Sequence, residues 1–130
     1  MGKVSNIHKL VPCRSSCKRL SKKEFNHTAM VWFKVPADNF TPEFWVLDSR
    51  EKFESLHIDL SKEIYYPAPT AQEFTEKMQD CFMRVEGSNL GDYLAQWVKS
   101  DSRSYWGHGK TPVIALYNCY MDYYRRNNGK

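Results

Sequence analysis

The stretch that decides the fold is Pro67-Ala-Pro-Thr-Ala-Gln-Glu-Phe74, in which two prolines precede a threonine. Thr70 can cap a helix, because its hydroxyl can accept the backbone N–H of Glu73 while the Glu73 carboxylate binds back to Thr70. Beyond this capping box, apolar residues recur at helical spacing and predict one buried face: Phe74, Met78, Cys81, Phe82 and Val85. Gly87 is a typical helix end, so the sequence predicts a helix over 70–87.

Strand-forming residues predict one hairpin on either side of this helix. The first pairs residues 29–35, which are rich in β-branched and aromatic side chains, with residues 43–47. The second pairs residues 92–99 with residues 103–106. Within residues 49–66, Ser49 with Lys52 and Phe53 allows a helical turn and Ile64-Tyr-Tyr66 reads as extended, but the structure of the region as a whole stays open.

Two further helices complete the expected fold. One covers residues 15–24, and the other begins after Thr111 as its cap, with Pro112 in the first helical position. The resulting order is α-β-β-α-β-β-α. We therefore expect an α+β protein with a single antiparallel four-stranded sheet and helices packed on it. The chain length predicts one domain over residues 1–130, with residues 1–12 as an irregular arm.

Composition is that of a globular protein, since 42% of the 130 residues are hydrophobic and 26% are charged. No apolar run reaches the length of a membrane span, and the N-terminus lacks the apolar core of a secretory signal. We therefore expect a cytoplasmic protein without membrane contact. Its four cysteines, Cys13, Cys17, Cys81 and Cys119, should then be thiols.

Positive charge is concentrated at the start of the chain. Residues 1–23 hold seven basic residues and no acidic ones, whereas the remainder is net −3. The overall charge of +4 therefore comes from this segment. Its basic helix fits contact with phosphate or with an acidic protein, and it also fits an ordinary solvated helix face.

These elements follow one another in an order that resembles a group of small phage- and prophage-encoded proteins with a helix–sheet–helix sandwich. The best mark is Ile64-Tyr-Tyr-Pro-Ala-Pro-Thr-Ala-Gln-Glu73, and the resemblance covers most of residues 17–126. It implies an accessory protein of a mobile element that binds and disables a host defence component inside an infected or lysogenic bacterium. The resemblance carries over no catalytic residues.

The segment Gly107-His-Gly-Lys-Thr111 has the glycines, lysine and threonine of a phosphate-binding loop. The full pattern requires a glycine where this chain has Ser104. A turn followed by a helix cap explains the segment, with a weak anion site at Gly109, Lys110 and Thr111 as the alternative. An enzyme that binds a nucleotide or phosphate through this turn is accordingly a second alternative function.

Metal and catalytic sites are not expected. Cys13 and Cys17 stand four positions apart near His8, without the second pair that zinc sites usually have. Cys81 and Cys119 each stand alone in an expected apolar helix face. No nucleophile elbow is present. We therefore expect neither an enzyme nor a metal or other cofactor.

Tryptophans alternate with lysines on the faces of two expected strands. If helices cover only one face of the sheet, Trp32 and Trp97 lie on an open face with lysines beside them. Such a face fits a protein partner, the seam of a homodimer, or bases of single-stranded nucleic acid stacked on the rings.

The sequence thus favours a non-catalytic binding protein that inhibits a host defence effector, such as a CRISPR nuclease complex, by occupying its surface. The expected contact residues combine the basic helix with two tryptophans: Lys18, Arg19, Lys22, Lys23, Trp32 and Trp45. A net charge of +4 argues against mimicry of DNA by an acidic surface. The first alternative is a small RNA- or DNA-binding module that uses the same basic helix.

Overall fold

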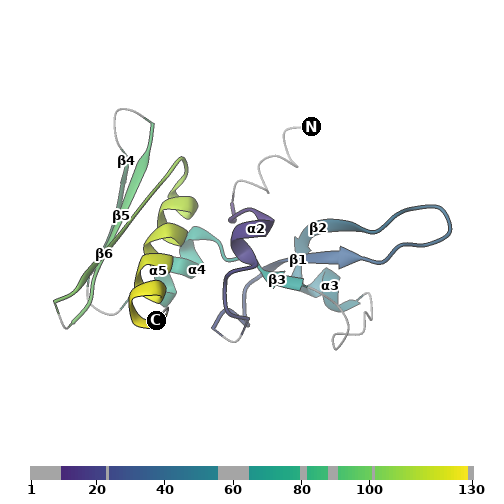
Figure 1. Cartoon of the computed structure of the whole chain (residues 1–130), viewed down its shortest axis with the longest axis horizontal. Coiled ribbons are helices and arrows are strands. Elements are labelled where there is room, and N and C mark those ends of the chain that lie inside the picture. Colours follow the sequence, from purple (N-terminus) through teal and green to yellow (C-terminus); the bar gives the residue numbers. More distant parts are fainter. Residues whose placement is uncertain are drawn as a thin grey trace. The chain divides into compact units, whose positions relative to one another are not determined.

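The computed structural model describes residues 10–22, 24–55, 65–79, 82–87, 91–100 and 102–128. They fall into two compact units, an N-terminal unit over Pro12–Pro69 and a C-terminal unit built mainly from Thr70–Lys130. Each unit contains one three-stranded antiparallel sheet (Figure 1). The α+β class is therefore confirmed, and the expected single four-stranded sheet is wrong. That residues 1–130 act as one domain stays a prediction.

The N-terminal unit is a small sheet with a helix on one face. Its elements are α2 (Arg14–Cys17), β1 (Met30–Val35), β2 (Phe44–Ser49), α3 (Arg50–Ser55) and β3 (Tyr65–Pro67). Strand β1 is central, and Phe33 pairs with Val46 on one side and Tyr65 on the other. Phe53 of α3 packs on this face, with its ring centroid 5.0 Å from that of Phe33. This aromatic cluster, together with Val31, is the core of the unit.

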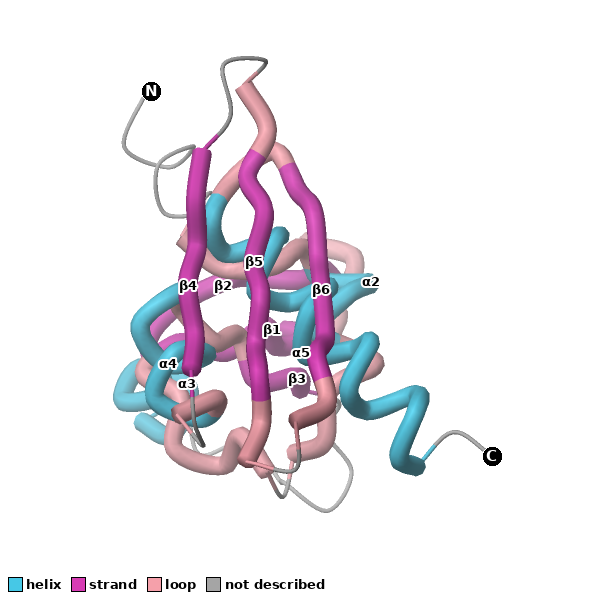
Figure 2. The backbone as a smooth tube through the Cα atoms, turned by 90° about the vertical axis from the view of Figure 1, so that its left-hand side faces the viewer, coloured by secondary structure: helices cyan, strands magenta, loops and turns pink. Residues whose placement is uncertain are grey.

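The C-terminal unit is a sheet with one long helix against one face. Its elements are α4 (Ala71–Lys77), β4 (Phe82–Gly87), β5 (Tyr93–Val98), β6 (Ser104–Gly109) and α5 (Pro112–Asn128). The strand order is β4-β5-β6, and α5 packs behind β5 and β6 (Figure 2). Gly107 allows this close approach, because a Cβ there would overlap the backbone of Ala115 and Cys119 in α5.

The helix predicted over 70–87 is less than half as long as expected, since α4 has seven residues. Its start is confirmed, since the Thr70 hydroxyl accepts the Glu73 N–H at 3.2 Å and the Glu73 carboxylate accepts the Thr70 N–H at 2.8 Å. However, α4 ends at Lys77, and residues 82–87 form strand β4. Arg84 and Glu86 alternate with apolar neighbours, so this segment also fits a half-covered sheet, and its pairing with β5 makes it a strand.

The first helix is also shorter than the expected range of 15–24. Helix α2 ends at Cys17, and the N–H groups of Arg19 and Leu20 then bond back only three residues, as in a tight turn. The Ser21 hydroxyl accepts the Glu24 N–H at 3.3 Å and so favours a separate turn over a continued helix.

The remaining predicted strands are found with shifted ends. Residues 43–47 correspond to β2, and residues 103–106 correspond to β6, which continues to Gly109. The last helix is confirmed, and the Thr111 hydroxyl accepts the N–H of Ile114 at 3.3 Å as a cap. None of the described helices is both long and apolar enough to cross a membrane.

Candidate binding surfaces

The basic residues after α2 are exposed as the sequence predicted. Lys18, Arg19 and Lys22 all project from the turn that follows this helix. Cys17, directly before Lys18, and Leu20, directly after Arg19, are buried, so they fix the turn to the N-terminal unit. Lys23 lies outside the described residues.

Trp45 is the centre of a stacked cluster on the sheet face opposite the Phe33 core. Its ring lies parallel to that of Tyr66 at a centroid distance of 5.1 Å and an interplanar angle of 15°. The Arg14 guanidinium lies 4.8 Å from the Trp45 centroid, and the Lys34 ammonium lies 5.8 Å from it. Cations near an indole face are attracted by its quadrupole. We call Arg14, Lys34, Trp45 and Tyr66, with the exposed Lys18 and Arg19, the basic–aromatic surface.

Trp32 lies on the same sheet face but has a structural contact. It is half-buried, and its indole N–H donates to the carbonyl oxygen of Pro12 at 3.1 Å, which ties the start of the unit to β1. Lys22 lies elsewhere, with its ammonium 4.3 Å from the ring centroid of Tyr65. The structure therefore brings Trp45 together with Arg14 and Lys34, and it places Trp32 and Lys22 in separate contacts.

Trp97 does not lie on an open sheet face. It is only 3% exposed and faces α5, with its ring centroid 4.9 Å from that of Tyr123. The expectation of an open-face Trp97 is therefore wrong, because α5 covers that side of the sheet. Trp106 takes the opposite face instead and is 42% exposed.

The glycine-rich segment belongs largely to strand β6. Gly109 is its last residue, and a Cβ at that position would overlap the side chain of Ile114 in α5. The Lys110 ammonium lies 3.0 Å from the carboxylate of Asp92 in an exposed ion pair. Thr111 caps α5. Each residue of the expected anion site thus has a structural contact, and anion binding there stays a prediction.

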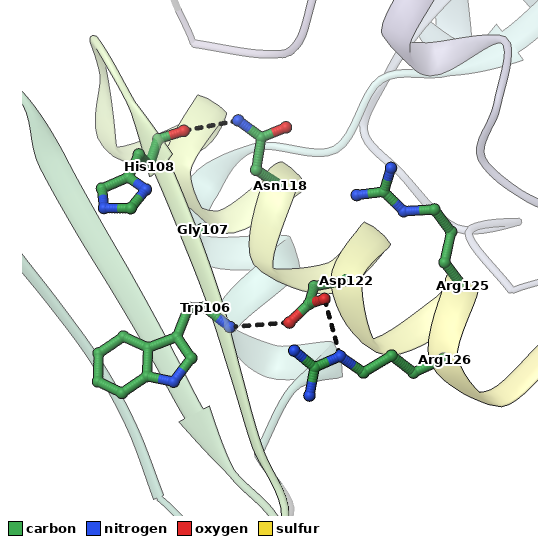
Figure 3. Close-up of a pocket in the computed structure, with 7 residues that line it drawn as sticks. All are labelled: Trp106, Gly107, His108, Asn118, Asp122, Arg125 and Arg126. Atoms are coloured by element: carbon green, nitrogen blue, oxygen red, sulfur yellow. Dashed lines mark hydrogen bonds and ion pairs between the residues drawn. The ribbon is translucent and has the colours of Figure 1, made fainter.

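A hollow of about 430 Å³ lies where the outer edge of β6 meets α5 (Figure 3). Seven residues line it: Trp106, Gly107, His108, Asn118, Asp122, Arg125 and Arg126. Several of these polar groups form hydrogen bonds or ion pairs with other residues that line the hollow. The Asn118 amide donates to the carbonyl of His108 at 2.6 Å, and the Asp122 carboxylate accepts from Arg126 at 3.0 Å. The hollow is therefore built mainly by contacts that hold the helix to the strand.

The described cysteines differ in exposure, and their thiol pKa values differ accordingly. Two serine hydroxyls, Ser15 and then Ser16, lower the pKa of the exposed Cys13 thiol to about 7. Burial raises the pKa of Cys119 to about 12, and it also raises the pKa of Cys17. All three are free thiols, and Cys81 lies outside the described residues. Among the described residues, no three His, Cys, Asp or Glu side chains gather in an arrangement that could hold a metal ion.

No protein-family model, curated protein or solved structure matches this chain. Its function must therefore be argued from the surfaces themselves.

Sequence reasoning missed three members of the basic–aromatic surface, namely Arg14, Lys34 and Tyr66. Arg14 counted only as one charge of a basic segment, although it is the cation that lies over Trp45. Tyr66 lies in the region whose structure stayed open, and it meets Trp45 only because β3 adds to the hairpin beside β1. The sequence does carry a signal for this strand, since Ile64-Tyr-Tyr66 reads as an extended segment.

Proposed function

We propose that this chain is a non-catalytic binding protein that acts by occupying the surface of a protein partner. The observation that carries the proposal is the Arg14–Trp45–Tyr66 stack, which combines an arginine with two aromatic rings. Tyrosine, tryptophan and arginine are the side chains most often found at the energetic centres of protein interfaces. Their mutual stacking also limits the entropy that a partner contact would cost.

The charges around the stack favour an acidic patch on the partner. Lys18 and Arg19, four and five residues after Arg14, are exposed, and Lys34 lies close to the Trp45 ring. Complementary charge accelerates association and disfavours wrong partners. We propose accordingly that the partner is a host defence effector, such as a CRISPR nuclease complex, and that the chain inhibits it. The phage or prophage setting rests on the sequence resemblance over residues 17–126.

The test begins with an affinity pull-down from bacterial lysate and continues with the purified partner. Arg14→Glu should weaken its binding about tenfold or more, because a charge is reversed at the centre of the interface. Lys52→Glu is the matched control, since Lys52 is an exposed cation of α3 in the same unit. If both variants weaken binding equally, the stack contributes no more than any other charged part of the surface, and the proposal is refuted.

A nucleic-acid-binding module is the second candidate, because arginine and indole faces also stack on bases. The salt dependence of binding distinguishes the two candidate functions. Binding to phosphates should fall by about 10³ or more between low and physiological salt if six or more phosphates are contacted. A protein interface centred on Trp45 should respond weakly. A mobility shift of RNA or DNA at low salt that Arg14→Glu removes would favour the nucleic-acid candidate.

A further inference from the structure

The loop that joins β1 to β2 presents a phenylalanine to solvent. Phe40 lies in the middle of residues 36–43 and is 95% exposed. In Figure 1 this loop extends beyond the ends of the two strands that it connects. Phe44, at the start of β2, is 45% exposed and adds apolar surface at the base of the loop.

The loop has a fixed shape rather than a loose one. The Asp38 carboxylate accepts the N–H of Phe40 at 2.8 Å and the N–H of Thr41 at 2.7 Å. The Asp38 N–H in turn donates to the Thr41 carbonyl at 2.9 Å. At the base, Lys34 and Glu43 form an ion pair at 3.5 Å. These bonds hold Phe40 at the tip, so little entropy remains to be lost when a partner binds it.

The Phe40 ring contributes nothing evident to the fold, since almost all of its surface faces water. A polar side chain would serve a solvent-exposed loop at least as well. Removing such a phenyl ring from water is favourable enough to make it an anchor in an interface.

The charges beside the ring indicate what kind of surface can receive it. Asp38 lies two residues before Phe40, and two backbone hydrogen bonds, from Phe40 first and then Thr41, lower the pKa of Asp38. Asp38 is therefore ionised at neutral pH. An apolar tip beside the Asp38 carboxylate is complementary to an apolar pocket with cations at its rim.

We infer that Phe40 is an anchor that inserts into an apolar pocket of a protein partner whose rim carries lysine or arginine side chains. The inference rests on the proposed function, since it needs a protein partner, and it adds a second contact of opposite charge to the basic–aromatic surface. Two other occupants fit less well. An anionic bilayer would repel Asp38, and a second copy docked tip to tip would bring the two Asp38 charges together.

The experiment places the photo-cross-linker p-benzoylphenylalanine at position 40, and at Asn39 as the matched control, in the full chain. After irradiation in lysate, the cross-linked peptide of the partner is sequenced and located on the partner's surface. We expect a cross-link from position 40 to an apolar pocket with a basic rim. A cross-link to a flat or acidic surface, or none from position 40 while the wild-type chain still binds a partner, would overturn the inference.

Affinities for the purified partner complete the test. Phe40→Ala should weaken binding about tenfold or more, and Asn39→Ala should leave it unchanged. Asp38→Asn keeps an oxygen to accept both loop N–H groups but removes the charge, so it should weaken binding less than Phe40→Ala and lower its salt dependence. All variants should melt at the wild-type temperature, because these side chains are exposed.

Failure of the inference and failure of the proposed function give different results. If Arg14→Glu weakens binding and Phe40→Ala does not, the inference is wrong and the proposed function stands. If the wild-type chain binds no protein, both are wrong. Phe40-dependent flotation with phosphatidylcholine–phosphatidylserine vesicles would assign the tip to a bilayer instead. Phe40-dependent dimers in sedimentation velocity would assign it to a second copy.

Discussion

The Asp122 carboxylate accepts the backbone N–H of Trp106 at 3.2 Å and so closes part of the outer edge of strand β6. Two other side chains of α5, one turn away on either side, also bind backbone groups on this edge of β6. Asn118 donates to the carbonyl of His108, and Arg126 donates to the carbonyl of Ser104 at 3.4 Å. Residues four apart on a helix are about 6 Å apart along the axis, close to the roughly 6.6 Å between alternate residues of a strand. The helix therefore takes the place of a fourth strand along this edge.

Removing the Asp122 carboxylate should destabilise the C-terminal unit. In Asp122→Ala the Trp106 N–H and Arg126 each lose a partner, and we expect a loss of about 1–2 kcal/mol in the free energy of unfolding. Chemical denaturation measures it. Asp122→Asn should be milder, since the amide oxygen can still accept the N–H. Equal stability of wild type and Asp122→Ala would show that the edge contacts contribute nothing.

The same change should expose a strand edge. Unpaired N–H and C=O groups on an edge strand are templates for pairing with another chain. We expect Asp122→Ala to associate at concentrations at which the wild-type chain does not, as measured by sedimentation velocity. Asp92→Ala is the matched comparison, because it removes an exposed carboxylate whose partner is Lys110 rather than a strand edge. Association of both variants alike would point to lost charge instead.

Gly107→Ala should be among the most disruptive single substitutions in the C-terminal unit. A Cβ there would overlap the α5 backbone at Ala115 and Cys119, so the helix would have to move off the sheet. We expect a destabilisation of about 3 kcal/mol or more. Gly91 provides the contrast, since it has φ +86° and no atoms within 4 Å of a Cβ. Gly91→Ala should cost only the roughly 1 kcal/mol of the left-handed conformation.

The sequence was informative where local chemistry decides the structure. The capping box at Thr70 and the cap at Thr111 rest on contacts between residues three positions apart, and both are found. The first hairpin is also found, because its first strand is rich in β-branched and aromatic residues. Residues 82–87 were misassigned because their apolar positions fit both a helix and a strand. Only pairing with β5 decides between the two, and that partner lies several residues further along the chain.

The candidate surfaces were less predictable, because they too depend on contacts between residues that lie far apart in the chain. The exposure of Lys18 and Arg19 follows from composition alone. The stack on Trp45 does not, because it joins residues from α2, β2 and β3. The exposure of Phe40 could not be predicted from the sequence pattern either, since an aromatic residue between two prolines is as consistent with burial as with exposure.

Cys13 should be the most reactive of the three described cysteines. Only the thiolate attacks an alkylating reagent, and a pKa of about 7 makes roughly half of Cys13 thiolate at neutral pH. Its rate with iodoacetamide should therefore rise through pH 7 and level off above it. Cys17 and Cys119 should react only on unfolding, because burial raises the pKa of each thiol and blocks access. Mass spectrometry of each cysteine-containing peptide against pH measures this.

The serines provide the internal comparison for Cys13. Ser15 and Ser16 hydroxyls lie 3.3 and 3.4 Å from its sulfur and can donate to the thiolate. In a Ser15→Ala, Ser16→Ala double variant the midpoint of the rate profile should move upward, toward the ordinary thiol pKa. A midpoint that stays near 7 would mean that another group lowers the pKa.

Lys110→Ala distinguishes a binding protein from an enzyme that uses the glycine-rich turn. Lys110 is 81% exposed and paired with Asp92, so the substitution should change the free energy of unfolding by no more than about 0.5 kcal/mol. If the chain acts by occupying a partner, the variant should protect a phage as well as the wild type does in a host-infection assay. Phosphoryl chemistry would instead need the lysine's charge, and loss of protection with an unchanged melting temperature would favour the enzyme.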